Sequence, residues 1–108
     1  MKRYVINWAI TARDDLEEIA AYIADDSPIN ALRVVERIEA RAQSLATLPM
    51  RGRIVPELHW HGVATFQELI ERPWRLIYRI DGSTVYVVSV LDGRRQLEDL
   101  LLARFLRH

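Results

Sequence analysis

FQELIERPWRLIYRIDGSTVYVVSVLDGRR, residues 66–95, is the stretch that decides the fold of this chain. Three runs in and beside it alternate between apolar and polar side chains, near residues 64–71, 74–81 and 84–91. A period of two is typical of strands with one buried face. Asp81-Gly82 lies between the last two runs and indicates a type I′ hairpin, in which both central residues have positive φ. We therefore predict three consecutive antiparallel strands.

The region before this stretch begins with a strand and a helix. An alternating pattern at the start of the chain predicts a short strand that includes Tyr4, Ile6 and Trp8. Thr11 and Asp14 have the spacing of a capping-box variant, which marks a helix start. This helix has one apolar stripe, which consists of Ala12, Leu16, Ile19, Ala20 and Ile23. Its acidic residues are expected to face water; they are Asp15, Glu17 and Glu18.

A second helix is predicted after a short turn, because Ser27 can cap it and Pro28 suits its first position. Its apolar positions are Ala31, Val34, Val35, Ile38, Ala42, Leu45 and Leu48. The two helices should form an antiparallel hairpin. Residues 49–62 show no clean period and are expected to be an ordered loop. The order strand, helix, helix, three strands predicts an α+β fold in two layers, with the hairpin on one face of the sheet.

Length and composition restrict the class of protein. A chain of 108 residues is expected to form one domain, residues 1–108. The sequence has no apolar run of membrane-spanning length, and its start lacks the apolar segment of a signal peptide, so we expect a cytoplasmic protein without a membrane partner. The absence of cysteine excludes disulfides, thiolate metal sites and cysteine nucleophiles.

Arginine dominates the basic residues. The formal net charge is zero, which argues against a general polyanion binder, yet fourteen of the 15 bases are arginine and the only lysine is Lys2. Arginine favours bidentate recognition of carboxylate or phosphate. The period of two sends Trp74, Leu76, Tyr78 and Ile80 to the sheet face that meets the helices. Arg75 and Arg79 then project from the opposite, open face, where Arg94 and Arg95 could join them. Such arginines either contact a partner or form surface salt bridges with Glu68, Glu71 or Asp92.

The C-terminal segment from Gln96 to Arg107 has more leucine and phenylalanine than one helical stripe can bury. Two interpretations stay open. The segment docks fully across its own sheet, or it offers an apolar surface to another protein.

Two histidines flank a tryptophan in the connecting loop. His59 and His61 could be offered as a metal pair, but two ligands are too few and no nearby cysteine or carboxylate completes a recognisable motif. We therefore predict no metal and no cofactor, and interpret both histidines as surface residues. Glu57, Glu68 and Tyr78 are the other acid–base candidates, with an ion pair as the plainer role for Glu68 and the core as the plainer place for Tyr78.

Short motifs follow one another in a specific order from Tyr4 to about Arg104. They are Ala12-x-x-Asp15-Leu16-Glu17-Glu18-Ile19-x-x-Tyr22-Ile23, Ser27-Pro28-x-x-Ala31, Leu45-x-x-x-Pro49-x-x-Gly52-Arg53-x-Val55-Pro56-Glu57-Leu58, Glu68-Leu69-Ile70, Trp74-Arg75-Leu76-Ile77-Tyr78-Arg79-Ile80 and Gly93-Arg94-Arg95. In this order and spacing the chain resembles the ParE/RelE superfamily of bacterial type II toxins, and more closely its ParE-like branch. The resemblance implies the RelE/ParE-like fold, with a short C-terminal helix.

The resemblance also implies partners. A cognate antitoxin, expected to be a ribbon-helix-helix protein, would neutralise the toxin, and DNA would be contacted only through that antitoxin. The implied target is DNA gyrase for ParE-like members and ribosome-bound mRNA for RelE-like members. For antitoxin binding we expect the helical hairpin and the C-terminal segment to offer apolar grooves, with Leu16, Ile23, Leu97, Leu101 and Phe105 as contacts.

The residue chemistry favours a toxin that acts on gyrase by binding. Cleavage of RNA by its own 2′-hydroxyl needs a proton acceptor and a proton donor as well as cations, and arginine supplies only the cations. The predicted target contacts are Arg75, Arg79, Arg94 and Arg95. One alternative is a RelE-type mRNA endonuclease that uses Arg53, Arg75, Arg79 and Arg94 with His59 or His61, and another is an inactive module that only binds an antitoxin.

The chain departs from the family pattern in two places. The family often has His-Gly-Arg-Arg where this chain has Asp92-Gly93-Arg94-Arg95, and Arg-Glu-Leu-Ile where it has Gln67-Glu68-Leu69-Ile70. Both departures weaken a nuclease-like or cationic role at those positions. They are equally compatible with a changed target or with a toxin that has lost potency.

Overall fold

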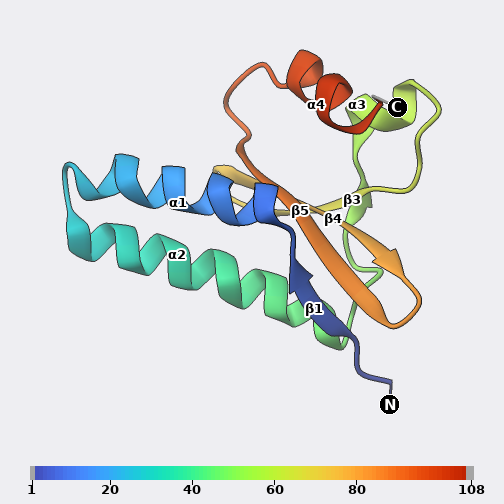
Figure 1. Ribbon diagram of the computed structural model, residues 1–108, viewed down its shortest axis with the longest axis horizontal. Helices are drawn as coiled ribbons and strands as arrows, with labels where there is room; N and C mark the ends of the chain where they lie inside the picture. The colour runs from blue at the N-terminus through green and yellow to red at the C-terminus, as the bar shows by residue number, and fades with distance from the viewer. Residues whose placement is uncertain (1, 107–108) are drawn as a thin grey trace.

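The computed structural model describes residues 2–106 and places one five-stranded sheet at the centre of the protein (Figure 1). The elements are β1 (Val5–Trp8), α1 (Ile10–Ala24), α2 (Pro28–Gln43), the 3-10 helix η1 (Ser44–Ala46), β2 (Arg53–Ile54), α3 (Pro56–Trp60), β3 (Gln67–Glu71), β4 (Trp74–Asp81), β5 (Thr84–Asp92) and α4 (Glu98–Phe105). The strand order is β1-β5-β4-β3-β2, with β1 parallel to β5 and the other pairs antiparallel. The predicted succession of strand, two helices, three strands and C-terminal helix is confirmed.

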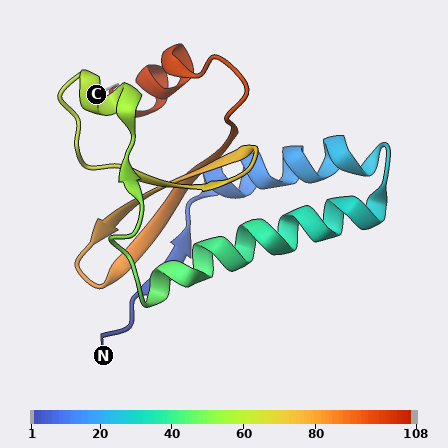
Figure 2. The same cartoon turned by 180° about the vertical axis from the view of Figure 1, so that it is seen from behind.

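The hairpin of α1 and α2 packs on one face of the sheet, as Figures 1 and 2 show from opposite sides. The apolar stripes of both helices meet the inward side chains of β4 and β5. The buried residues of this core are Ala12, Val34, Ile38, Ala42, Leu45, Leu69, Trp74, Leu76, Tyr78, Val85, Val87 and Val90. The face predicted for Trp74, Leu76 and Tyr78 is thus confirmed.

The opposite face of the sheet is covered as well. Short helices α3 and α4 lie beside each other there (Figure 1) and enclose a second core of Val55, Leu58, Ile77, Leu91, Leu97 and Leu101. The prediction of an open face is therefore wrong over this part of the sheet. The reason is that Ile77 and Leu91 are large apolar side chains on that face, and burying them stabilises the fold.

Local signals at the element ends had mixed outcomes. Ser27 caps α2 as predicted, since its Oγ accepts a hydrogen bond from the backbone N–H of Asn30 at 3.1 Å. The capping box at Thr11 is wrong, because α1 begins at Ile10, so Thr11 lies inside the helix, and the N-cap residue, Ala9, makes no side-chain cap. The turn between β4 and β5 has positive φ at Gly82 alone among its residues, 61°, so it has the pattern of a type II′ turn and not the predicted type I′.

The connection from residue 49 to 62 is ordered, as expected, although β2 and α3 within it were not predicted. The buried Tyr78 Oη donates to the carbonyl of Pro49 at 2.7 Å and accepts from the N–H of Gly52 at 3.0 Å. A Cβ atom at residue 52 would lie 2.5 Å from Tyr78 Oη and 2.6 Å from the carbonyl oxygen of Glu68. This close approach explains why the motif has glycine at Gly52.

Asp15 is buried, so the prediction that it faces water is wrong. Its Oδ2 accepts from the backbone N–H of Val90 at 3.0 Å and from Arg104 Nη1 at 2.8 Å, while its Oδ1 accepts from Arg104 Nη2 at 3.1 Å. One carboxylate therefore joins α1, β5 and α4.

None of the helices within residues 2–106 combines the length and apolar character that crossing a membrane requires.

Candidate functional site

Four charged side chains from four elements form an ion cluster at the edge of the second core. Arg75 on β4 donates from Nε to Glu68 Oε1 on β3 at 2.7 Å, and from Nη1 and Nη2 to both oxygens of Glu57 on α3 at 2.6 and 2.7 Å. Arg53 on β2 donates from Nε to Glu68 Oε2 at 2.7 Å. Arg75 and Glu68 are only 9% and 1% exposed. The cluster satisfies two charges that folding removes from water.

The cluster shifts the pKa values of Glu57 and Arg75. The bidentate hydrogen bonds from Arg75 hold the pKa of the Glu57 carboxyl below its usual value, and they outweigh the effect of burial. The two carboxylates likewise raise the pKa of Arg75. All three nitrogens of the Arg75 guanidinium already donate hydrogen bonds, so this residue supports the structure and has little capacity left for a ligand.

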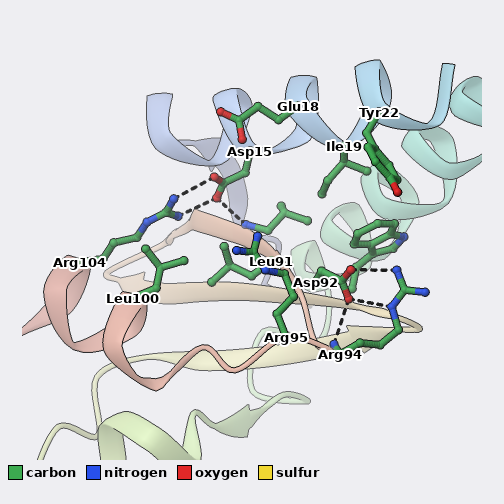
Figure 3. Close-up of a pocket in the computed structure, with 12 residues that line it drawn as sticks. Asp15, Glu18, Ile19, Tyr22, Leu91, Asp92, Arg94, Arg95, Leu100 and Arg104 are labelled. Atoms are coloured by element: carbon green, nitrogen blue, oxygen red, sulfur yellow. Dashed lines mark hydrogen bonds and ion pairs between the residues drawn. The ribbon is translucent and has the colours of Figure 1, made fainter. Parts of the chain in front are cut away.

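A shallow groove of about 620 Å³, the basic groove, lies next to this cluster. Four arginines contribute to its lining, which consists of Arg53, Ile70, Arg72, Pro73, Arg75, Gly93 and Arg94. Arg94 is held by Asp92, which accepts hydrogen bonds from Arg94 Nε at 3.0 Å and Nη2 at 2.8 Å (Figure 3). These bonds lower the pKa of the Asp92 carboxyl. The Arg94 side chain nevertheless remains 70% exposed.

The structure brings only part of the predicted arginine set together. Arg53, Arg75 and Arg94 line the basic groove, whereas Arg95 lines a neighbouring cleft. Arg79 lines neither of them; it stacks over the Tyr86 ring at 4.4 Å near the β4–β5 turn. The expectation that Arg75 projects from an open face is wrong, because α3 covers it and supplies Glu57. The plainer interpretation, a salt bridge between Arg75 and Glu68, is confirmed.

The two histidines lie apart from the basic groove. His59 is on α3 and His61 follows it, and both are exposed, as predicted for surface residues. His61 Nε2 lies 3.8 Å from Glu98 Oε2 on α4. Within residues 2–106 no three His, Cys, Asp or Glu side chains are placed to hold a metal ion together. Tyr78 is in the core, where burial raises the pKa of its phenol.

The residues predicted for antitoxin binding lie in different environments. Leu97 and Leu101 are buried in the second core, and Phe105 packs against Phe66 with ring centroids 4.6 Å apart. The C-terminal segment therefore docks on its own sheet, and the prediction that Leu97 and Leu101 form an exposed contact surface is wrong for the chain alone. The abundant leucines are needed because they cover a second sheet face.

A second groove runs along the helical hairpin. This hairpin groove has a volume of about 270 Å³ and is lined by Trp8, Arg13, Leu16, Glu17, Ala20, Val35 and Glu39. Leu16 and Ile23 are both half-buried against the first core, and of the two only Leu16 also lines the groove. The groove combines an apolar floor with charged residues of both signs. Sequence reasoning missed Trp8 and Val35 as lining residues because it interpreted Trp8 only as part of a strand and Val35 only as part of the apolar side of the second helix.

Comparisons with known proteins agree with this architecture. The sequence model of the family described as the ParE toxin of type II toxin–antitoxin systems, parDE, matches residues 6–97. The protein Y4kP of Sinorhizobium fredii is 33% identical over 103 residues, which are 94% of this chain and 100% of that protein. Toxin RelE2 of Caulobacter vibrioides is 34% identical over 89 residues, 82% of this chain and 93% of that toxin. Toxin ParE3 of the same bacterium is 30% identical over 84 residues, 77% and 80% of the two chains.

Solved structures share the fold. A chain of the chromosomal ParDE system from P. aeruginosa matches with a TM-score of 0.67 at 22% identity, over 83% of this chain and 96% of that one. A chain of the toxin–antitoxin complex RelBE2 from Mycobacterium tuberculosis matches with a TM-score of 0.63 at 27% identity, over 85% and 93%. The chain belongs to the ParE toxin family of type II toxin–antitoxin systems. The resemblance noted in its motifs is thereby confirmed.

Proposed function

We propose that this toxin acts by binding to DNA gyrase, without cleaving RNA, and that a cognate antitoxin neutralises it in the cytoplasm. The observation that carries the proposal is the chemistry of the basic groove. Its charged lining consists of Arg53, Arg72, Arg75 and Arg94, and arginine stays protonated at neutral pH. A groove of this kind can hold an anionic surface in place but contributes no proton acceptor.

The nearest titratable groups support the same conclusion. Glu57 and Glu68 do not line the groove, and arginine nitrogens lie 2.7 Å or less from their oxygens, so both carboxylates are already occupied as hydrogen-bond acceptors. His59 and His61 are on and after α3 and do not line the groove. A nuclease of RelE type would have to obtain its acid and base elsewhere, and binding is the simpler use of these residues.

The hairpin groove is the proposed binding site of the antitoxin. Its apolar floor suits the apolar face of an amphipathic helix, and its rim residues Arg13, Glu17 and Glu39 can pair with charges on either side of such a helix. Exposed Ile29 and Leu32 on α2, each 65% accessible, extend the apolar surface of the hairpin. The matching RelBE2 structure is itself a toxin–antitoxin complex, which supports an antitoxin partner here.

The decisive experiment is a parallel assay with purified gyrase and with purified translating ribosomes. We expect loss of supercoiling or trapped DNA breaks, with the mRNA intact. Arg72→Ala and Arg94→Ala should weaken gyrase inhibition several-fold, because both arginines line the basic groove. Arg33→Ala, which removes an exposed arginine from α2, is the matched control and should have no effect.

The other outcomes separate the alternatives. Codon-positioned cuts in mRNA with unaffected gyrase would overturn the proposal in favour of RelE-type cleavage. Silence in both assays, with an antitoxin still bound, would assign the protein as an inactive antitoxin-binding module.

A further inference from the structure

The carboxylate of Asp92, the last residue of β5, lies against Arg94 of the basic groove (Figure 3). Its Oδ1 accepts hydrogen bonds from the backbone N–H of Arg94 at 2.9 Å and from Arg94 Nε at 3.0 Å, and its Oδ2 accepts from Nη2 at 2.8 Å. Because Arg94 lowers the pKa of this carboxyl, Asp92 is ionised at neutral pH. An anion that approaches Arg94 therefore meets a negative charge beside the guanidinium.

The turn that carries both residues is tightly packed. The backbone N–H of Gly93, between them, donates to the carbonyl of Pro73 at 2.7 Å. A Cβ atom at residue 93 would lie 2.9 Å from that carbonyl oxygen and 3.0 Å from Arg75 Cγ. The backbone from Asp92 to Arg94 is thus held against the start of β4, which keeps the two side chains together.

Arg94 retains donors for a ligand despite this pairing. Asp92 uses two of the five guanidinium N–H groups, one on Nε and one on Nη2, and the other three have no acceptor within residues 2–106. Arg72, which also lines the groove, is exposed and forms no ion pair in the same part of the chain. Both arginines are therefore available to an incoming anion.

The groove has only a small excess of positive charge. Four guanidiniums line it, and three carboxylates accept hydrogen bonds from them; the carboxylates are those of Glu57, Glu68 and Asp92. The remaining single positive charge matches one carboxylate on the surface of a protein. A nucleic acid gains its affinity from contacts with several phosphates, and each phosphate near Asp92 is repelled by it. Without Asp92 the excess would be two charges.

We propose that Asp92 determines the specificity of the basic groove: its carboxylate disfavours nucleic acid, so that the groove binds a single carboxylate of a protein. The proposal rests on the proposed function in that the basic groove is the site for the target. Asp92 acts through Arg94 and is a positioning residue, since it holds the guanidinium and reduces the charge that a ligand meets.

The test measures binding of a fluorescently labelled oligothymidylate to the purified protein by anisotropy at low salt. Asp92→Asn removes the charge but keeps an oxygen that can accept from the Arg94 N–H. We expect it to bind the oligothymidylate about fivefold more tightly than the original protein, the scale of one exposed charge pair. Asp26→Asn removes the same charge from the exposed turn between α1 and α2 and is the matched control, which should bind like the original.

Two further measurements separate specificity from a structural role. In a salt series the slope of log Kobs against log salt should steepen by about 0.7 in Asp92→Asn, the value for one additional phosphate contact on a single strand. In the Arg94→Ala protein, Asp92→Asn should bring no gain, because the carboxylate acts through that guanidinium. Circular dichroism checks that each variant is folded.

Several results would overturn the proposal. These are equal affinities of the original protein and Asp92→Asn, an equal gain in Asp26→Asn, a gain that persists without Arg94, or an unchanged salt slope. An equal gain in the control would mean that only the net charge of the protein matters.

The oligothymidylate assay contains no gyrase, so this proposal and the proposed function fail separately. The fivefold gain without gyrase inhibition by any variant would keep the role of Asp92 and remove the proposed target. Gyrase inhibition by the original protein without the gain would remove the role of Asp92 alone.

Discussion

Glu68 contacts two arginines from opposite sides of its strand. Arg53 on β2 and Arg75 on β4 each place a guanidinium Nε 2.7 Å from one Glu68 oxygen. A carboxylate that is 1% exposed has lost its hydration, and both hydrogen bonds are needed to offset that loss. One side chain therefore links three neighbouring strands.

Removing this carboxylate should be costly. In Glu68→Ala, Arg75 keeps Glu57 but loses its partner on Nε, and we expect the free energy of unfolding to fall by about 3 kcal/mol. Glu71→Ala is the matched control on the same strand, because Glu71 lies 3.4 and 3.7 Å from two partly exposed arginines and should matter by less than about 1 kcal/mol. Urea unfolding measures both. Equal losses in the two variants would show that burial of the pair is unimportant.

Glu57 should make stability depend on acid pH. Arg75 depresses its folded-state pKa below the ordinary 4.5, so the folded protein keeps Glu57 ionised where the unfolded chain takes up a proton. The stabilisation is fully present above the unfolded pKa and is lost as the pH falls from about 5 through the folded pKa. The stability difference between the original protein and Glu57→Gln should therefore shrink below pH ~5 and stay constant above it. A pH series of urea titrations measures this, and a difference that is independent of pH would contradict the pairing.

At the scale of elements, α4 depends on tertiary contacts. Its N-cap residue, Leu97, makes no side-chain cap, and eight residues are too few for a helix to be stable alone. Leu101 anchors the helix in the second core, and Arg104 ties its last turn to Asp15 and to Ser89 Oγ at 2.9 Å. The position of the helix thus depends on a contact with α1, which is far away in sequence.

Asp15→Ala should loosen α4. The change leaves the Val90 N–H without its acceptor and Arg104 without its counter-ion, and we expect a loss of about 3 kcal/mol together with faster amide exchange in α4. Asp14→Ala, on the neighbouring exposed residue, should stay within about 0.5 kcal/mol. Hydrogen exchange followed by mass spectrometry distinguishes the two variants. Unchanged exchange in α4 would mean that the leucines alone hold it.

The sequence predicted the elements that are long enough to show a period. α1, α2 and the three C-terminal strands lie close to their expected ranges, whereas β2 and α3 contain two and five residues and display no period at all. That omission explains the main error about the candidate site. The period of two assigned Arg75 to the correct face, but its burial depends on Glu57 from α3. Alternation fails on β5, where the register shifts opposite Ile77 and Tyr78: Val85 and Val87 lie in the first core, and so does Val90, three residues further on.

At the scale of the whole molecule, the basic groove and the hairpin groove share no residue. The first is formed by strands β2, β3 and β4 and the turn after β5, whereas α1 and α2 supply most of the second. With the target on the basic groove and the antitoxin on the hairpin groove, as proposed, we expect substitutions to separate target binding from antitoxin binding. A toxin that escapes its antitoxin without losing its action should exist.

Ala20→Glu should be such a toxin. Ala20 lines the hairpin groove. A charged side chain there would lose its hydration if an amphipathic helix bound over it, so it should prevent that helix from binding. Ala21→Glu places the same charge on the exposed neighbour and is the control. When each variant is co-expressed with the antitoxin, Ala20→Glu should stop growth and Ala21→Glu should be neutralised, with circular dichroism confirming that both fold. If the antitoxin neutralises both variants, it binds to another part of the toxin.

The parallel pairing of β1 with β5 has a consequence for synthesis. β1 is at the edge of the sheet and has β5 as its strand neighbour, so translation delivers it long before the strand it pairs with. The ion pair between Asp15 and Arg104 can form only later still, because Arg104 is synthesised after β5. The helical hairpin can form early because its contacts are local, but the sheet and its arginines reach their final positions only when nearly the whole chain has left the ribosome. We therefore expect the nascent chain to offer the surface for its antitoxin before it can harm the cell that makes it.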